Sequence, residues 1–560
     1  MSNLTPSRLG ELRNQYKFFD IIKELRDNPN SVEDMFFLVE SYIELGNYNK
    51  ALLILQDWQF SLDKKKSWIH WCFLNGKILL KLGSFEESII ALKQAELLLG
   101  KDNESQIAML VSITKSESYL RSGQLEKVEE INNKNQKLLE IKGDEYRDIK
   151  SYSWKMVGNL SWLKGDMDTA FDAFSKALML IEREGNPSDI GGLVYNIGLI
   201  HYFKGEKDES IDRYQKALEY YTNTGNDFDN ARVLTALGRA YHEDGYFTKA
   251  ELYYKKSLIL KERIGNPQSL ATTYINLGQI FHDRGVLKAA LEYYEKAYHL
   301  DKKIKNNLDM AIDLVNIGNV KNELGKKSEA LNHYKEAYKF FKKSGNERNI
   351  GEVILDILYL KKEMNIFKKS DPMISEFPAN TSENPIVYAM NLMLKALLSE
   401  DRDNALKNYV QVLEIEGIEY GTRLEIYWNI IQLNIEKWNQ KPELEIIETI
   451  KYYLDEYENQ CRKNHLTGHL CKVLLLKARF MKIRGNFDEI DKILTQTILI
   501  AEEYDLEIYK KIAEKELIEF ENTKSELIKI NSSERQSETL ELEELINYYK
   551  ELSTLISFAS

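Results

Sequence analysis

Glycine recurs along this chain with a fixed step of 40 residues, and this periodicity restricts the possible fold more than any other feature. The first series consists of Gly158, Gly198, Gly238, Gly278 and Gly318. The second consists of Gly165, Gly205, Gly245, Gly285 and Gly325. A third series marks unit ends with Gly-Asn at 185–186, 225–226, 265–266 and 345–346, and with Lys-Asn at 305–306. Three series in one register predict stacked supersecondary units.

Each unit has the pattern of two amphipathic helices. One apolar stripe, spaced i, i+3, i+4 and i+7, consists of Tyr274, Leu277, Gly278 and Phe281. A second stripe, after the break at Gly285, consists of Leu287, Ala290, Tyr294 and Ala297. Both stripes are typical of helices that bury one face. We therefore expect an antiparallel helix pair, closed by a left-handed glycine cap at the Gly-Asn step.

The composition agrees with an all-α fold and excludes several classes of protein. Only 8 prolines and 28 glycines interrupt 560 residues, and the net charge of −12 argues against a dominant nucleic-acid partner. No apolar run is long enough for membrane insertion, and the first residues lack a signal core. Three cysteines make no disulfide framework. We expect a cytoplasmic protein.

The spacing W/Y-x-x-L-G-x-x-Y, followed by G-x-Y/F-x-x-A and Y-x-x-A, resembles the tetratricopeptide repeat. The step of 40 residues is similar to the longer repeats of Leu-Gly-Asn adaptors and kinesin light chains. The resemblance implies a right-handed superhelix of antiparallel helix pairs, an α-solenoid that binds proteins. It is followed here by a second, diverged helical array.

The strength of the pattern divides the chain into five predicted segments. Weaker repeats occupy residues 1–145, the regular array 146–368 (with a last turn at Asn365), a proline-containing linker 369–385, and diverged helices 386–530. An acidic helix is expected at 531–560, where a heptad stripe consists of Leu542, Leu545, Tyr549, Leu552 and Ile556. That helix either caps the array or mediates self-association.

No catalytic motif is present, so neither an enzyme nor a cofactor is expected. The sequence lacks a G-x-x-x-x-G-K-[ST] phosphate loop, an H-E-x-x-H pair and a G-x-S-x-G elbow. One cluster, Cys461, His465, His469 and Cys471, contains zinc-ligating residue types. On a continuous helix Cys471 would lie about 160° from His469, so we predict packing or solvent roles and no metal.

The resemblance implies a concave peptide groove lined by the first helix of each pair. One groove position, two residues before the first-series glycine, holds Asn196, Asn276 and Asn316, with Ala236 as the exception. An amide that donates and accepts suits the backbone of an extended peptide. The alternative is that each asparagine bonds within its own helix pair.

A second resemblance concerns adaptors that bind the terminal carboxylate of a peptide. The corresponding positions here are Lys155, Asn159, Asn196, Thr235 and Arg239, of which only Thr235 departs from the family pattern. A carboxylate clamp is therefore one hypothesis for this surface, and a patch that merely tolerates anions is the other.

Aromatic and imidazole side chains complete the predicted groove. They are Tyr152, Trp162, Tyr195, Tyr202, His242 and His282. Such residues either contact a peptide, as at binding hot spots, or pack on the neighbouring repeat. The sequence thus predicts a non-enzymatic scaffold for a protein or peptide of unknown identity. The alternative is a regulatory sensor that signals through the C-terminal helical array.

Overall fold

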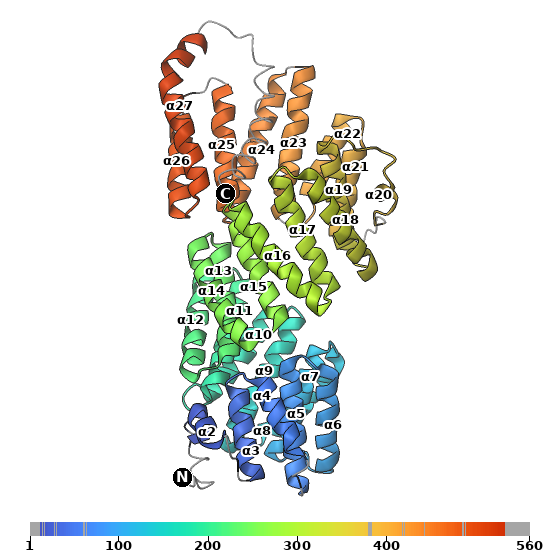
Figure 1. The fold of residues 1–560 in the computed structure, drawn as a ribbon, viewed down its shortest axis with the longest axis vertical. Coiled ribbons are helices and arrows are strands. Elements are labelled where there is room, and N and C mark those ends of the chain that lie inside the picture. The colour runs from blue at the N-terminus through green and yellow to red at the C-terminus, as the bar shows by residue number, and fades with distance from the viewer. Residues whose placement is uncertain are drawn as a thin grey trace. The chain divides into compact units, whose positions relative to one another are not determined.

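The computed structural model describes residues 12–531 apart from short gaps at 14, 16, 27–28, 30, 60–61, 63, 379–383, 417, 419, 442, 484–486 and 488. Throughout this part of the chain the regular structure is helical, with no strand (Figure 1). The predicted C-terminal stripe from Leu542 to Ile556 lies outside the described residues. No described helix is long and apolar enough to cross a membrane.

The chain divides into two compact units. Unit 1 comprises Met1–Ala240 and Lys255–Gly265, and unit 2 comprises Tyr241–Tyr254 and Asn266–Ser560. Unit 1 contains α2 (Phe18–Leu25), α3 (Val32–Glu44), α4 (Tyr48–Asp57), α5 (Lys65–Leu82), α6 (Phe85–Leu99), α7 (Gln106–Arg121), α8 (Leu125–Glu140), the 3-10 turn η2 (Asp144–Tyr146), α9 (Arg147–Leu163), α10 (Met167–Ile181), α11 (Pro187–Phe203) and α12 (Lys207–Thr224). The helices α13 (Asp227–Glu243) and α14 (Phe247–Ile264) contribute residues to both units.

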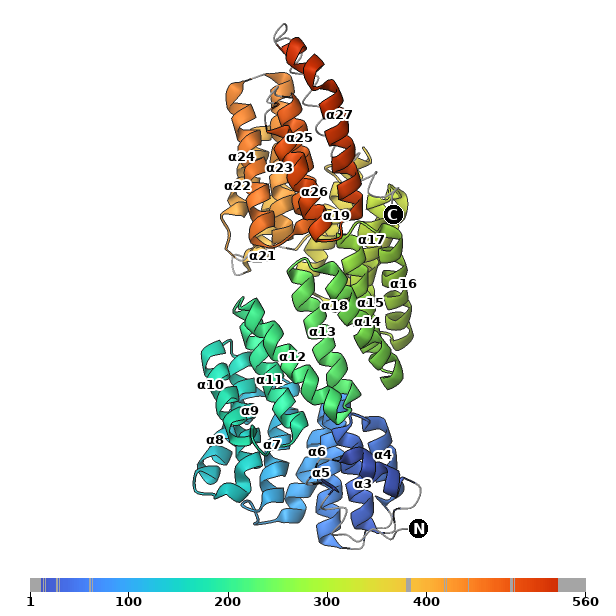
Figure 2. The same cartoon turned by 90° about the vertical axis from the view of Figure 1, so that its left-hand side faces the viewer.

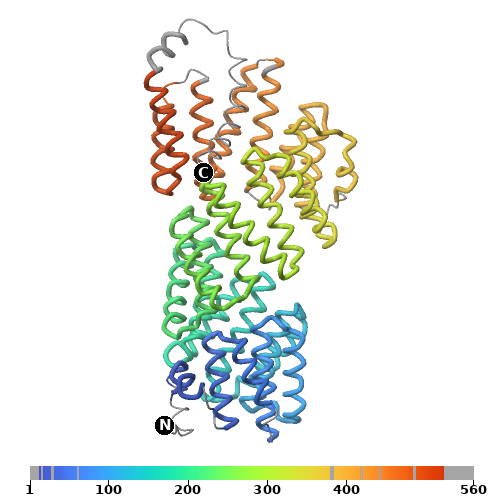
Figure 3. The backbone as a smooth tube through the Cα atoms, viewed as in Figure 1, coloured from blue at the N-terminus to red at the C-terminus, as the bar shows by residue number. Residues whose placement is uncertain are grey.

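Unit 2 continues the same alternation of helices and short turns. It contains α15 (Pro267–Asp283), α16 (Leu287–Ile304), α17 (Asn307–Glu323), α18 (Lys327–Ser344), α19 (Glu347–Glu363), α20 (Pro372–Ser375), α21 (Pro385–Leu398), α22 (Arg402–Leu413), α23 (Tyr420–Gln440), α24 (Leu444–Lys463), α25 (Thr467–Ile483), α26 (Ile490–Glu503) and α27 (Glu507–Asn531). Helices that follow each other in the sequence lie side by side, as the backbone trace shows (Figure 3). The predicted helix pairs are confirmed.

The turn glycines have the left-handed conformation that the break between the helices requires. Gly165, Gly205, Gly245, Gly285 and Gly325 have φ between 75° and 81°. At the ends of the 40-residue repeats, the backbone is also left-handed at Gly225, Gly265, Gly345 and Lys305, but not at Gly185. A side chain costs free energy in this conformation, which explains the recurrence of glycine.

The asparagine of each Gly-Asn pair begins the next helix, a role that the sequence did not reveal. The side chains of Asn186, Asn226, Asn266, Asn306 and Asn346 accept a hydrogen bond from a backbone N–H two or three residues later. This is the N-cap interaction that satisfies an otherwise unpaired donor. One Gly-Asn pair therefore ends one helix and begins the next.

The first-series glycine lets the two helices of a pair approach closely. A Cβ atom at Gly278 would lie 2.7 Å from a ring carbon of Tyr294, and one at Gly318 would lie 2.5 Å from Tyr334. Gly158 faces Phe174 in the same way. Because these rings are buried, they cannot withdraw without opening the pair.

Unit 1 closes on itself through contacts between repeats far apart in the sequence. The Asn226 side chain donates to the Glu44 carbonyl oxygen at 2.9 Å, and Asn186 donates to the Glu44 carboxylate at 2.8 Å. Tyr48 packs edge-on against Phe228, with ring centroids 5.2 Å apart. The weak N-terminal repeats are thus held against the starts of α11 and α13.

Unit 2 shows a similar long-range closure. The Thr248 hydroxyl donates to Asp505 at 2.5 Å, and the rings of Tyr246 and Tyr504 lie 5.6 Å apart. In the segment expected as a linker, Met373 and Phe377 pack against the core that α17, α18, α19, α21, α22 and α23 share. The helices α21 to α24 lie alongside one another in the second view (Figure 2).

Three further turns of unit 2 are left-handed without glycine, one at the end of the regular array and two in the diverged array. Asn365, His465 and Asp505 have φ of 58°, 53° and 57°. Asn365 was predicted as a turn, but His465 was treated as part of a continuous helix. That assumption was wrong, because α24 ends at Lys463 and α25 begins at Thr467.

Candidate functional site

Every predicted binding residue lies on the first helix of a helix pair. In each unit, the first helices of successive pairs form one surface, which we call the inner face of that unit. Unit 1 holds Tyr152, Lys155, Asn159, Trp162, Tyr195, Asn196, Tyr202 and Arg239. Unit 2 holds His242, Asn276, His282 and Asn316. The predicted residues therefore belong to two faces.

Several predicted side chains connect one repeat to the next. The Trp162 ring packs on Phe203, with centroids 4.8 Å apart. His242 Nε2 lies 2.7 Å from Asp283 Oδ2, and His282 Nε2 lies 2.9 Å from Glu323 Oε1. In all three pairs the partner stands 41 residues later. These three side chains therefore contact the neighbouring repeat, and their contact with a peptide stays a prediction.

The His282–Glu323 pair is charged at neutral pH. Burial favours the neutral imidazole, but the adjacent Glu323 carboxylate outweighs burial and raises the pKa of His282 to about 9. The same pairing lowers the pKa of Glu323 although burial opposes this. This ion pair fixes α17 against α15.

The tyrosines of unit 1 serve as platforms for arginines of the following repeat. The Arg232 guanidinium lies 4.5 Å from the ring centroid of Tyr195, and that of Arg239 lies 4.6 Å from Tyr202. Tyr152 donates its hydroxyl proton to a Glu117 carboxylate oxygen at 2.5 Å. Such stacking is worth about 0.5–2 kcal/mol, so these rings contribute to repeat packing.

The residues of the hypothetical carboxylate clamp have mixed surroundings. Thr235 Oγ1 donates to the Ala231 carbonyl at 2.9 Å and receives a hydrogen bond from Lys261 Nζ at 3.0 Å, so it faces α14. Burial lowers the pKa of Lys155, although the Glu117 carboxylate opposes this shift. Asn159 Nδ2 lies 3.9 Å from Met156 Sδ within its own helix. The clamp stays a prediction.

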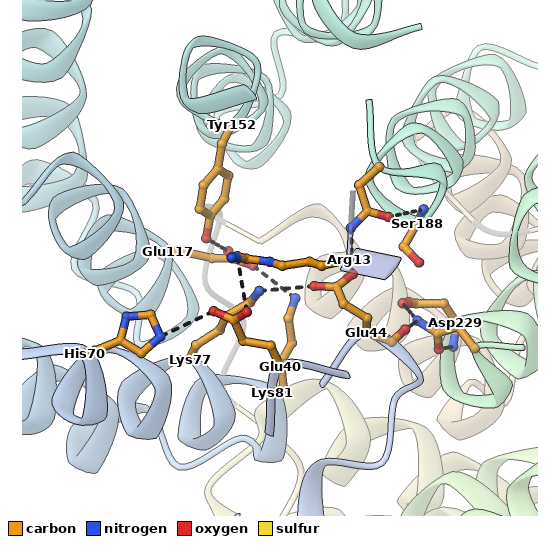
Figure 4. A network of polar contacts seen from close by, with 12 residues as sticks. Arg13, Glu40, Glu44, His70, Lys77, Lys81, Glu117, Tyr152, Ser188 and Asp229 are labelled. Atoms are coloured by element: carbon orange, nitrogen blue, oxygen red, sulfur yellow. Dashed lines mark hydrogen bonds and ion pairs between the residues drawn. The ribbon is translucent and has the colours of Figure 1, made fainter. Parts of the chain in front are cut away.

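A network of acids and bases fills the inner face of unit 1, and sequence reasoning missed it (Figure 4). Glu40 pairs with Arg13 at 3.1 Å and with His70 at 3.3 Å. The further pairs are Lys77–Glu44 at 3.4 Å and Lys81–Glu117 at 3.8 Å. The pairs of His70, Lys77 and Lys81 join α5 to α3 or α7, so the network links successive repeats.

Glu117 shows how strongly this network is coupled. Burial would raise its pKa, but the charges of Lys81 and Lys155 outweigh burial and lower it to about 2. Only 6% of its side chain is exposed. No sequence motif marks it, because its partners come from α5 and α9 and are brought together by repeat stacking.

The three groove asparagines differ from the other predicted residues. Asn196, Asn276 and Asn316 are half-buried, and none forms a hydrogen bond with another described residue. The alternative of bonding within the helix pair is therefore not seen. Each amide can still donate and accept two hydrogen bonds.

Comparison with known families explains the repeat. A family model described as the tetratricopeptide repeat matches residues 190–263 and 269–343. The chain contains tetratricopeptide repeats. No curated protein sequence matches it significantly. The particular similarity to Leu-Gly-Asn adaptors and kinesin light chains stays a prediction.

Solved structures that are similar to this chain include the following three. The apo form of RapI is 12% identical, with a TM-score of 0.48, covering 70% of this chain and 98% of that one. A Rap protein complexed with competence and sporulation factor is 13% identical, with a TM-score of 0.46, covering 72% and 99%. The apo quorum sensor NprR from B. thuringiensis is 15% identical, with a TM-score of 0.44, covering 70% and 97%.

Beyond the tetratricopeptide repeats, the cysteine–histidine cluster has a packing environment. Cys461 and Cys471 are both fully buried, and burial raises the pKa of the Cys471 thiol to about 12. His469 Nδ1 lies 3.5 Å from the Tyr457 hydroxyl, whereas His465 occupies the turn. Among the described residues, no group of three His, Cys, Asp or Glu side chains is arranged to hold a metal ion.

Proposed function

We propose that the protein is a non-enzymatic interaction module that binds an extended peptide, free or within a partner protein, along the inner face of its repeats. The observation that carries the proposal is the pair Asn276 and Asn316 in unit 2. They occupy the same position in successive helix pairs, are half-buried, and have no hydrogen-bond partner among the described residues.

The chemistry of these side chains suits a peptide backbone. A buried amide without a partner costs about 1–3 kcal/mol, so a half-buried one gains by binding a ligand that has both a donor and an acceptor. Peptide groups supply both at regular intervals. Side chains beside them, such as His282, are already engaged with the next repeat and make the face rigid. A preorganised face loses less entropy on binding.

Asn196 gives unit 1 the same chemistry on its own inner face. The adjacent residue Tyr195 stacks on Arg232, and the same inner face carries the charged network of Figure 4. We propose a separate peptide contact at this face, with a preference for a ligand that carries both charges. The two faces are tested independently.

The test is affinity selection from a library of free pentapeptides on the full chain, read by mass spectrometry. Asn276→Ala/Asn316→Ala should lose retained peptides by about 10-fold, because two hydrogen bonds of about 0.5–1.5 kcal/mol each disappear. Asn196→Ala tests unit 1 alone. Asn332→Ala, an exposed asparagine on α18, is the matched control. Equal retention by the wild type and the double variant would contradict peptide binding in unit 2.

A regulatory sensor is a second candidate, and contacts within unit 2 favour it. A Cβ atom at Gly468, on α25, would lie 2.7 Å from the Asp283 carbonyl oxygen. Lys472 and His469 on the same helix influence the pKa values of His282 and Glu323. The C-terminal array therefore touches the proposed binding face. A sensor predicts altered hydrogen exchange in α25–α27 when a selected peptide is added, whereas a passive scaffold predicts none there.

A further inference from the structure

Unit 2 contains a cavity of about 270 Å³ between α19, α21 and the start of α23. Its apolar lining residues include Leu355, Met390, Met393 and Ile418. Its charged lining residues are Glu352, Asp356, Glu425 and Arg348. The volume is below the roughly 300–1,000 Å³ of pockets for drug-sized ligands, so the cavity suits a single long side chain.

Two of the three carboxylates in this cavity have no cationic partner among the described residues. Glu352 Oε1 accepts a hydrogen bond from Arg348 Nε at 2.9 Å, and this ion pair neutralises the charge of Glu352. Asp356 and Glu425 have no hydrogen bond or ion pair with another described residue. The nearby Arg423 donates to the carbonyl oxygens of Leu413 and Ile415, away from the acids.

Asp356 is half-buried and Glu425 is exposed, and neither is paired with a cation among the described residues. Burial, followed by the charges of Glu425 and Glu352, raises the pKa of Asp356 to about 8. A positive group beside Asp356 and Glu425 would favour the ionised forms of both acids. The cavity should therefore prefer a positively charged ligand.

The cavity lies in the same register as the groove asparagines. Asp356 stands 40 residues after Asn316 and 80 after Asn276, so it occupies the same position on α19 as they do on α17 and α15. A peptide that follows the inner face of unit 2 past the two asparagines meets Asp356 in the next pair. The acid-lined cavity therefore continues the proposed groove.

We propose that this cavity receives a lysine or arginine side chain of the peptide, an inference that rests on the proposed function. Lysine and arginine combine an apolar stem with a charged head, and this matches a cavity lined by both apolar and acidic residues. The thioethers of Met390 and Met393 can adapt to stems of either length. Asp356 and Glu425 would bind the cationic head.

The experiment repeats the pentapeptide selection on three proteins: the wild type, Asp356→Asn/Glu425→Gln and Asn276→Ala/Asn316→Ala. The neutral substitutions keep the shape of the cavity and remove its charge. The wild type should enrich lysine or arginine at one position, and the acid variant should lose that enrichment by about 10- to 100-fold. Glu414→Gln, an exposed glutamate in the same unit, is the matched control and should behave as the wild type. Circular dichroism verifies the fold of each variant.

The outcomes separate this inference from the function on which it rests. Lost lysine or arginine preference in the acid variant, with other peptides still retained, supports the cavity. Peptides retained by the wild type without any basic preference, or with a preference that survives in the acid variant, overturn the cavity and leave peptide binding intact. Equal retention by the wild type and the asparagine variant contradicts the proposed role of the asparagines, and if the acid variant also behaves as the wild type, both proposals are overturned.

Discussion

A buried pair of aspartates makes the stability of unit 2 dependent on pH. Asp301, near the end of α16, and Asp313, on α17, are completely inaccessible to solvent. None of their four carboxylate oxygens has a hydrogen-bond donor among the described residues, and the two carboxyls face each other closely enough to share a proton. Burial, followed by the charge of Asp301, raises the pKa of Asp313 to about 8.

The sign of the effect follows from proton linkage. Because the pKa of Asp313 is higher in the folded chain than in the unfolded chain, the folded state binds more protons between pH 4 and 8. The free energy of unfolding must therefore fall as the pH rises through this window. One extra bound proton gives a slope of about 1.4 kcal/mol per pH unit, or about 2.7 kcal/mol between pH 5 and 7.

Asp313→Asn should remove most of this slope. The amide can donate to Asp301 at every pH, so the variant should be more stable than the wild type at pH 8, by about 2–3 kcal/mol. Urea unfolding at pH 5, 6, 7 and 8, followed by circular dichroism, measures both slopes. Asp172→Asn, at an exposed site on α10, is the control. Equal slopes in the wild type and Asp313→Asn would refute the shared proton.

Three further predictions concern packing and charge. Gly278→Leu should destabilise the fold by about 1–3 kcal/mol or more in urea unfolding, because the new side chain would meet Tyr294. The control Gly421→Leu, with no atom within 4 Å of its Cβ, should not destabilise it. Equal unfolding midpoints of the two variants would exclude the close helix contact. Asn226→Ala should lower the free energy of unfolding by about 1 kcal/mol more than Asn266→Ala does. Both variants lose an N-cap, but only Asn226 also bonds to Glu44. Equal losses of stability would show that the contact with Glu44 adds nothing. In an NMR titration of the wild type, the midpoint of His282 should lie near pH 9. In Glu323→Gln, which lacks the partner charge, the midpoint should fall below about 6.5. A wild-type midpoint near about 6.5 would disprove the ion pair.

The helix pairs could be predicted because local chemistry determines them. A left-handed turn favours glycine at every repeat, and a tight helix crossing favours it once more, so both series are visible in the sequence. Where another residue takes the left-handed position, the pattern disappears. The turns at His465 and Asp505 in the C-terminal array could not be recognised from the sequence for this reason.

The inner-face contacts could not be predicted, because they depend on how successive repeats are placed. His282 meets Glu323 across 41 residues, while Asn186 meets Glu44 across 142. The first separation follows from the repeat length, but the second requires unit 1 to curve back on itself. No residue type near Glu44 signals that closure. The charged network around it was missed for the same reason.

One principle accounts for which inner-face residues remain able to bind a ligand. Long side chains such as Trp162, Arg239 and His282 reach the neighbouring repeat and contact a side chain there. An asparagine in the same row is too short to do so, and its amide stays unpaired at Asn276 and Asn316. Side-chain reach, together with residue type, therefore separates packing positions from binding positions along this face. Asp356, equally short and in the same register, follows the same rule.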